Sequence, residues 1–458
     1  MRDLLVTAIV LITLPFILKR PSIGVILWVW LSVMNPHRLA WGFAYDLPFA
    51  AIVAGVTFVG LAITHDKRRL PITPATITLA LFMLWMCLTS LFPYHSGTGY
   101  EMWSRVMKIL LMTFVALTVL NTRQHLQWLV WILVFSLGFF GVKGGIFTLL
   151  NGGNYLVWGP PSSFIEGNNE VALALVMIVP LMRYLQLQLT RPWQRWTMSA
   201  AMLLCVLASL GSHSRGAMLA VVAMAVFLWW KSRNKIGMGI VLIAFGLVLV
   251  AFMPEEWLTR MNTIKTYEDD TSAMGRINAW YMAFNLATDR FLGGGFDIYD
   301  YEIFGRYAPD PLDVHAAHSI YFQVLGEHGF VGLALFLALG WFTWRAATDA
   351  KRRARKRRDA QWVMTLSDMI KVSLVGYAVG GAFLSLAYFD LPYYLLVLAV
   401  ASREWVKALP VESPVTAPGM RRAMSEGGLV SARVRLDAPA MRPPPANPMA
   451  AGGRFEKR

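Results

Sequence analysis

The chain has 458 residues, 56% of them hydrophobic and 15% charged, and its mean hydropathy is +0.50. A soluble protein of this length could not bury so much apolar surface, whereas a lipid bilayer solvates such surface directly. The formal net charge of +15 would suit a nucleic-acid-binding protein, but most of the excess lies between apolar runs and in the C-terminal tail. We therefore expect an all-α polytopic membrane protein with no nucleic-acid partner.

Apolar runs of about 20 residues, the length that spans the hydrocarbon core as a helix, recur along the chain. They extend to about Val406 and predict 12 or 13 spans, because two short runs in the first 35 residues form either one broken helix or a hairpin. No small-residue cleavage site follows the first run, so we expect this segment to be retained. The two cysteines, Cys87 and Cys205, lie inside apolar runs and predict neither a disulfide nor a metal site.

Basic connectors between the apolar runs predict the topology, because Lys and Arg are retained in the cytoplasm during insertion. The cytoplasmic connectors are then residues 19–20, 65–69, 121–125, 183–195, 231–235 and 351–358. The external connectors are residues 35–46, 92–104, 151–169, the turn around Arg215, 254–318 and 390–392. This divides the chain into an N-terminal helix bundle (1–253), an external loop (254–318), C-terminal membrane helices (319–408) and a cytoplasmic tail (409–458). The Pro-rich and Arg-rich tail cannot bury a core and is predicted to be disordered.

The external loop differs in charge from the rest of the chain. Residues 254–318 contain 11 acidic and 5 basic residues, a net charge of −6, which predicts a water-facing segment with its own structure. Within it, residues 271–287 (TSAMGRINAWYMAFNLA) predict a helix with Thr271 or Ser272 as N-cap and an apolar face. The triple glycine at 293–295 predicts a flexible turn after that helix.

Three residues with suitable chemistry lie at the outer ends of spans or in this loop. Arg215 occupies the turn GSHSRGAMLA, Arg276 lies on the predicted loop helix, and His318 stands where the loop re-enters the membrane. An arginine presents a planar fork of donors to phosphate oxygens, so two of them could hold a pyrophosphate and stabilise it as a leaving group. A histidine could take a proton from an attacking sugar hydroxyl.

Each of the three also has a structural interpretation. Arg215 could extend to lipid head groups, Arg276 could pair with a neighbouring loop carboxylate, and His318 could cap the helix that follows it. His315 lies three residues before His318 and competes for any role assigned to it.

A further polar segment opens the span after residue 167. Asn168, Asn169 and Glu170 could hydrogen-bond a sugar or cap that helix. The sequence contains no Walker loop, no dinucleotide-binding glycine pattern and no Cys/His metal spacing, and the external loops lack an Asp-x-Asp motif. We therefore expect neither a cofactor nor a metal ion.

Three motifs, in this order, resemble the O-antigen ligase and polymerase superfamily of bacterial envelope glycosyltransferases. They are SRGA at 214–217, GRINAW at 275–280 followed by FLGGGFD, and HSIYFQVLGEHG at 318–329. The resemblance covers roughly residues 1–408. Residues 34–50 and 163–170 (SFIEGNNE) are also similar to a branch described as exosortase-associated O-glycosylation ligases.

The resemblance implies a metal-independent, inverting, GT-C-like enzyme with about 12 transmembrane helices in the bacterial inner membrane. Such an enzyme transfers a polysaccharide from undecaprenyl pyrophosphate to a lipid A–core sugar hydroxyl on the periplasmic face. Carried over by motif position, Arg215 and Arg276 would engage the donor pyrophosphate and His318 would position or deprotonate the acceptor. Asn168, Asn169 and His315 remain candidates for substrate binding.

Other functions are compatible with parts of this pattern. An O-antigen polymerase or a protein O-glycosylation ligase would use the same lipid-linked donor with a different acceptor. A lipid-linked oligosaccharide transporter would be expected to show internal repeats and several ionisable residues near mid-span. We find no repeat, and Lys143 is the clearest ionisable residue deep in a run, which favours an enzyme.

Overall fold

The computed structural model describes residues 1–64, 70–95, 99–232, 234–252 and 271–410. All regular secondary structure in these ranges is helical, which confirms the predicted all-α class. The predicted tail beyond residue 410 and the first part of the external loop, residues 253–270, lie outside the described residues.

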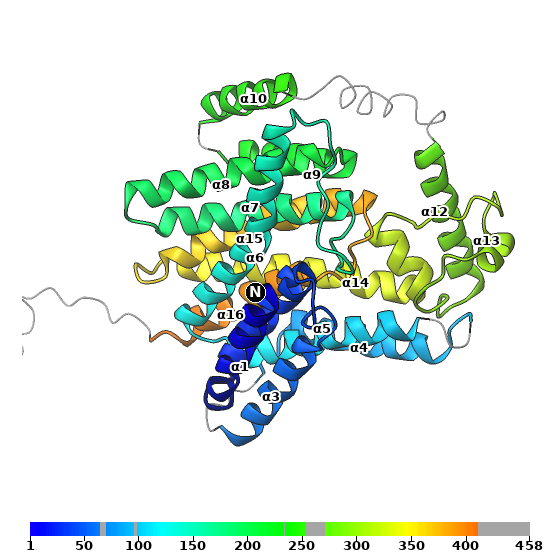
Figure 1. Cartoon of the computed structure of the whole chain (residues 1–458), viewed down its shortest axis with the longest axis horizontal. Helices are drawn as coiled ribbons and strands as arrows, with labels where there is room; N and C mark the ends of the chain where they lie inside the picture. Colours follow the sequence, from blue (N-terminus) through cyan, green and yellow to red (C-terminus); the bar gives the residue numbers. More distant parts are fainter. Residues whose placement is uncertain (65–69, 96–98, 233, 253–270, 411–458) are drawn as a thin grey trace, which may run out of the picture. The chain divides into compact units, whose positions relative to one another are not determined.

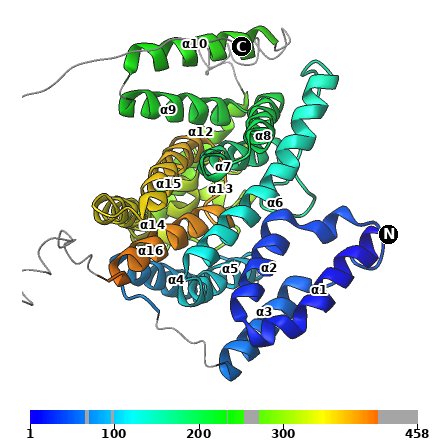
Figure 2. The ribbon, with the colours of Figure 1, turned by 90° about the vertical axis from the view of Figure 1, so that its left-hand side faces the viewer.

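The first 63 residues form helices α1 (Arg2–Lys19), α2 (Pro21–Met34) and α3 (Phe49–Ile63), with a 3-10 turn η1 (Pro36–Leu39) between the last two. Helix α1 ends before Arg20, and Pro21 is the first residue of α2. The Asp3 carboxylate at the start of α1 accepts hydrogen bonds from the amides of Gly42 (3.0 Å) and Ala44 (3.2 Å), which follow α2. The two N-terminal runs therefore form a hairpin, and α3 packs against both helices (Figure 2).

The rest of the chain consists of longer helices joined by short connectors and one large loop. They are α4 (Pro74–Leu91), α5 (Tyr100–Val119), α6 (Arg123–Leu150), α7 (Asn168–Gln188), α8 (Pro192–Gly211), α9 (Arg215–Lys231), α10 (Lys235–Phe252), α12 (Thr271–Asp289), α13 (Tyr301–Tyr307), α14 (Ile320–Ala354), α15 (Gln361–Gly380), η3 (Gly381–Phe383) and α16 (Asp390–Ala408). The helix predicted over residues 271–287 is thus present as α12.

Helix α16 lies inside the bundle, in contact with α14, α15, α5, α6 and α2. Nearly every side chain from Asp390 to Ser402 is buried, as expected for a helix that is apolar on all sides. The buried Asp390 carboxylate accepts a hydrogen bond from the Ser32 hydroxyl (2.6 Å), which ties this helix to α2. Around α16, the pairs α7–α15, α14–α15 and α14–α4 pack side by side (Figure 1).

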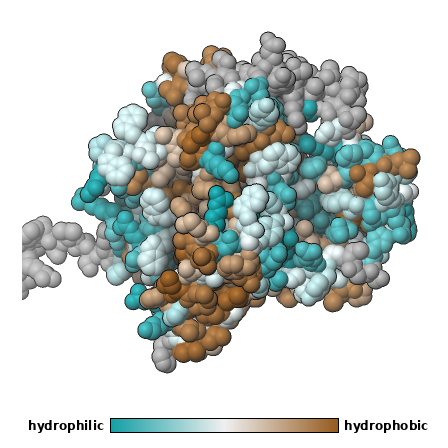
Figure 3. Space-filling view, viewed as in Figure 1, coloured by the Kyte–Doolittle hydropathy of each residue, from teal (hydrophilic) through white to brown (hydrophobic). Residues whose placement is uncertain are grey.

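Six described helices are long and apolar enough to cross a membrane. They are Pro74–Leu91, Tyr100–Val119, Arg123–Leu150, Asn168–Gln188, Ile320–Ala354 and Gln361–Phe383. In the view of Figure 3, hydrophobic side chains cover much of the middle of the face, and hydrophilic ones gather over α12 and α13. The chain is therefore a multi-pass membrane protein. The span count of 12 and the orientation remain predictions.

Helix α14 is broken at Gly329, whose backbone (φ 66°, ψ −173°) occupies a region essentially restricted to glycine. Three successive carbonyls before the break accept hydrogen bonds from other parts of the chain. The Gly294 amide donates to Gly326 (2.9 Å), the Gly295 amide to Glu327 (2.9 Å) and the Trp85 indole to His328 (2.8 Å). The triple glycine of the loop thus docks on the broken helix and attaches α12 and α13 to the bundle.

We expect Gly329→Ala to lower the free energy of unfolding by about 2 kcal/mol, because the left-handed backbone disfavours a Cβ. That Cβ would also lie 2.4 Å from the Phe291 carbonyl oxygen. Gly340→Ala in the same helix is the control, since a Cβ there meets no atom within 4 Å, and it should stabilise by about 0.5–1 kcal/mol. Thermal unfolding of the detergent-solubilised protein measures both. Equal shifts would contradict the special role of Gly329.

Candidate functional site

The motif GRINAW on α12 anchors the segment that leads to His318. The Asn278 amide donates to the carbonyls of Asp310 (2.8 Å) and Asp313 (3.0 Å), and its oxygen accepts from the Asp310 amide (2.9 Å). The Trp280 indole donates to the Ala317 carbonyl (2.7 Å), directly before His318. Asn278 and Trp280 therefore fix both ends of the last connector of the loop.

Gly275 and His315 meet on the same side of α12. A Cβ at Gly275 would lie 2.8 Å from His315 Nδ1, so any larger residue here would make the imidazole shift. The His315 Nδ1 also lies 2.7 Å from Asp313 Oδ1. His315 is thus held at the edge of the site with about half of its side chain exposed.

His318 adopts a left-handed backbone conformation (φ 42°), which is uncommon for a residue with a side chain. Ser319 is the N-cap of α14, so His318 does not cap this helix. Its Nδ1 lies 3.9 Å from Oε1 of Glu170 on α7. Arg276 lies close enough to interact electrostatically with both His318 and Glu170. The structure therefore brings α7, α12 and the start of α14 together at one point.

Arg215 is the first residue of α9, and the turn before it is held by α7. The Asn168 amide donates to the Ser212 carbonyl (2.8 Å), and the His213 Nε2 donates to the Gly153 carbonyl (2.8 Å). His213, like His318, has a left-handed backbone (φ 56°). Asn169 follows Asn168 in the first turn of α7 and is half-buried. Asn168 thus acts here as a support for the turn that presents Arg215.

Burial and charge hold His318 in its neutral form. Its pKa is lowered from 6.5 to about 4, first because burial disfavours the charged ring and then because Arg276 and His315 place positive charge nearby. A neutral imidazole can accept a proton at physiological pH, which a charged one cannot.

The sequence analysis named Glu170 only as a sugar ligand or a helix cap and did not place it beside His318. The Glu170 side chain is 16% exposed, its Oε1 lies 3.9 Å from the Nδ1 of His318, and it interacts electrostatically with Arg276. The sequence signal was an acidic residue in the first turn of an apolar span, which is costly unless it has a partner. The partner lies 148 positions further along the chain, so sequence spacing could not identify it.

Residues 200–337 match the family described as O-antigen ligase. This match supports membership of the O-antigen ligase superfamily. Residues 1–190 match a family of unknown function, and no curated protein matches the chain. The match supports a ligase-type or polymerase-type, glycosyltransferase-like enzyme that works with lipid-linked glycans in a membrane.

The two matched regions contribute different parts of the site. The O-antigen ligase segment contains Arg215, Arg276, His315 and His318, whereas Asn168, Asn169 and Glu170 come from the N-terminal match. Among the residues that the structure describes, no group of three or more His, Cys, Asp or Glu side chains is arranged to hold a metal ion. The charges that converge at this site belong to arginine, histidine and glutamate.

Removing the Asn278 side chain should release the connector that carries His318. We expect Asn278→Ala to cost about 2–4 kcal/mol, because it leaves three polar backbone groups without their partner, and to speed amide hydrogen exchange over residues 308–318. Asn285→Ala is the control, because Asn285 donates to the Tyr307 carbonyl on the same helix pair. Unchanged exchange over 308–318 in Asn278→Ala would contradict the anchoring role.

Proposed function

We propose that this protein is an O-antigen ligase that transfers a polysaccharide from undecaprenyl pyrophosphate to a lipid A–core sugar hydroxyl on the periplasmic face of the inner membrane. The observation that carries this proposal is the convergence of Arg276, His318 and Glu170 from three separate elements. Arg215 begins the helix whose entry turn is bonded to α7, the helix that carries Glu170.

In this proposal Arg215 and Arg276 bind the pyrophosphate of the donor. Each guanidinium offers several N–H donors in a plane that matches phosphate oxygens, and it keeps its charge as the leaving group forms. As the bond between the anomeric carbon and the pyrophosphate oxygen breaks, negative charge grows on that oxygen. The two arginines stabilise this charge, a role that often contributes two to four orders of magnitude in rate, roughly.

The acceptor hydroxyl attacks the anomeric carbon from the opposite face, and its proton passes to neutral His318. Glu170, beside Nδ1 of that ring, orients the imidazole and stabilises the positive charge it gains. Glu170 is a positioning residue in this scheme. Asn169 and His315 would contact sugars in this scheme, since both are only partly buried.

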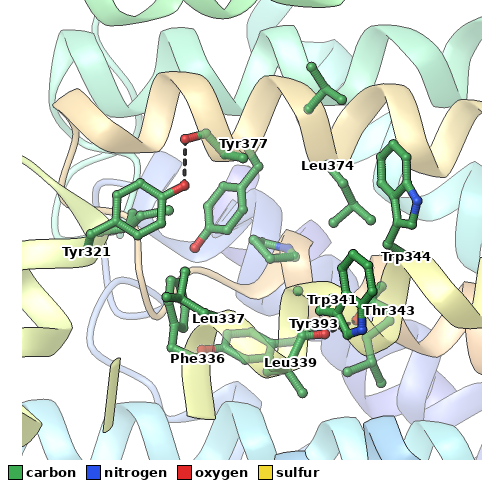
Figure 4. Close-up of a pocket in the computed structure, with 16 residues that line it drawn as sticks. Tyr321, Phe336, Leu337, Leu339, Trp341, Thr343, Trp344, Leu374, Tyr377 and Tyr393 are labelled. Carbon is green, nitrogen blue, oxygen red and sulfur yellow. Dashed lines mark hydrogen bonds between the residues drawn. The ribbon is translucent and has the colours of Figure 1, made fainter. Parts of the chain in front are cut away.

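An apolar cavity beside the site suits the hydrocarbon tail of the donor. It has a volume of about 360 Å³, lies among α14, α15 and α16, and begins at Ile320 and Tyr321, directly after the His318–Ser319 pair. Figure 4 shows Trp341, Trp344 and Leu374 along its wall and the hydrogen bond from the Tyr321 hydroxyl to the Ala378 carbonyl (2.7 Å). A polyprenyl chain could lie in this cavity while its pyrophosphate reaches Arg276.

The proposal is tested with purified protein, undecaprenyl-pyrophosphate glycan and lipid A–core, and the product is detected as lipopolysaccharide of higher mass. We expect Arg276→Ala and His318→Ala to reduce the rate by about a hundredfold or more. Arg276→Lys should be nearly as damaging, because a point charge does not replace a planar fork. Arg290→Lys, in the same loop, is the control. Full activity of Arg276→Lys would show that charge alone suffices.

The same assay separates the alternatives. Longer lipid-linked chains without modified lipid A–core would indicate a polymerase, and transfer to a protein side chain would indicate a protein ligase. Movement of the donor across vesicles without any transfer would indicate a transporter. We expect activity to persist with EDTA, because the arginines supply the positive charge at the pyrophosphate. Loss of activity that a divalent ion restores would overturn that expectation.

The pH dependence tests the role of His318 separately. Because the neutral ring is the base, kcat/KM should stay level as the pH falls from about 7 to about 5 and decline only near the lowered pKa of about 4. In His315→Gln the decline should move slightly upward, since His315 is the weakest of the three causes that lower the pKa of His318. A decline centred near 6.5 would contradict this assignment.

A further inference from the structure

A second cavity lies at the far end of α14 from His318. It has a volume of about 590 Å³ and is enclosed by the start of α4 and the last turns of α14 and α16. Its charged wall consists of Arg345, Arg352, Arg353, Arg403 and Asp349. Its apolar wall includes Pro74, Ala75, Trp341, Phe342 and Ala346.

Positive charge exceeds negative charge in this cavity. The Asp349 carboxylate accepts hydrogen bonds from Arg352 (2.7 Å), Arg353 (2.8 Å) and Arg403 (2.8 Å), and Arg403 also pairs with Glu404 (2.8 Å). With both carboxylates counted, the four arginines leave a net charge of +2.

One carboxylate thus organises three guanidiniums and leaves most of their N–H groups available. Each guanidinium has five N–H donors, and Asp349 takes one from each of its three partners. Within the described part of the chain Arg345 forms no ion pair, and its guanidinium lies over the Trp341 ring, 5.9 Å from the ring centre. Positively charged N–H donors of several arginines therefore line one wall of the cavity, and the opposite wall is apolar.

A charged wall beside an apolar wall suits a lipid, because the arginines can bind its phosphate and the apolar side chains can contact its acyl chains. Helices α4 and α14 are both candidate membrane spans, and the cavity lies at their ends, where an interface between hydrocarbon and water is expected. Trp341 is 57% exposed and lines this cavity as well as the apolar one among α14, α15 and α16. A free phosphate ion would use the arginines but leave the apolar wall without a partner.

We propose that this cavity binds the head group of an anionic phospholipid. The phosphate lies against Arg345 and Arg352, and the first carbons of the acyl chains pack on Trp341 and Phe342. The lipid would be a resident component and not a substrate, since the site is on the far end of α14 from His318. By bridging α4, α14 and α16 it would hold these helices together on the side opposite the candidate active site.

The experiment measures binding of dioleoyl phosphatidylglycerol to the delipidated full chain by native mass spectrometry, with dioleoyl phosphatidylcholine as the neutral lipid. Arg345→Gln/Arg352→Gln removes the arginine without an ion pair among the described residues and Arg352, whose side chain is 78% exposed against 41% for Arg353. It leaves Asp349 paired with Arg353 and Arg403. We expect about tenfold weaker binding of phosphatidylglycerol, with phosphatidylcholine unaffected. Lys356→Gln/Arg358→Gln is the matched control, since it removes two charges from the same basic stretch outside the cavity.

Three outcomes would overturn the proposal. They are equal affinity of the double variant and the wild type, an equal loss in the control, and displacement of the lipid by inorganic phosphate at the concentration of the lipid. The second would indicate a diffuse basic surface and the third a site for free anions. If the double variant unfolds, Arg345→Gln alone provides the test, because this exposed side chain has no ion pair to lose, and it must still weaken lipid binding.

Discussion

The structure depends on how a broken membrane helix satisfies its backbone. A carbonyl without a donor costs several kcal/mol, roughly, in an apolar environment, and in a membrane no water can replace the missing bond. The break of α14 at Gly329 is tolerated because two glycine amides of the loop and one indole reach the three carbonyls before it. The loop is therefore attached to the bundle at a defined place, and the first part of α14, with His318 before it, is held by the same contacts.

The docking of the loop on α14 brings Arg276 close to Glu170 and His318, three residues that are far apart in the sequence. Arg276 approaches both Glu170 and His318, and the positive charge together with burial keeps the imidazole neutral. His213 and His318 adopt left-handed backbones, which cost roughly 1–3 kcal/mol each and persist only where the surroundings impose them. The bond from His213 to Gly153, and that from Trp280 to Ala317 beside His318, hold the chain at these two positions. Backbone strain thus lies directly beside the residues proposed to act on substrate.

Helix α14 joins two chemically different regions. Its N-terminal end follows His318 and contributes to the apolar cavity proposed for the donor tail, and its C-terminal end carries the arginines gathered around Asp349. Both regions use guanidiniums beside an apolar wall, which suits amphipathic phosphate-bearing molecules. A donor lipid at one end and a structural lipid at the other would account for both with the same physical principle.

Hydrophobic runs and the positions of the charges determined the helical membrane class, the helix at 271–287 and the choice of Arg215, Arg276 and His318, because each depends on local composition or motif order. The tertiary structure alone decided that Asn168 supports the turn before Arg215 and that Glu170 lies beside His318, since these partners are 44 and 148 positions apart. The tertiary structure also decided that the triple glycine docks on α14. The hydrogen bonds of these glycines join backbone groups, so no side-chain pattern in the sequence identifies their partners. Likewise, the pKa of His318 depends on burial and on the neighbouring Arg276 and His315, and the burial and the approach of Arg276 exist only once α12 has packed against the start of α14.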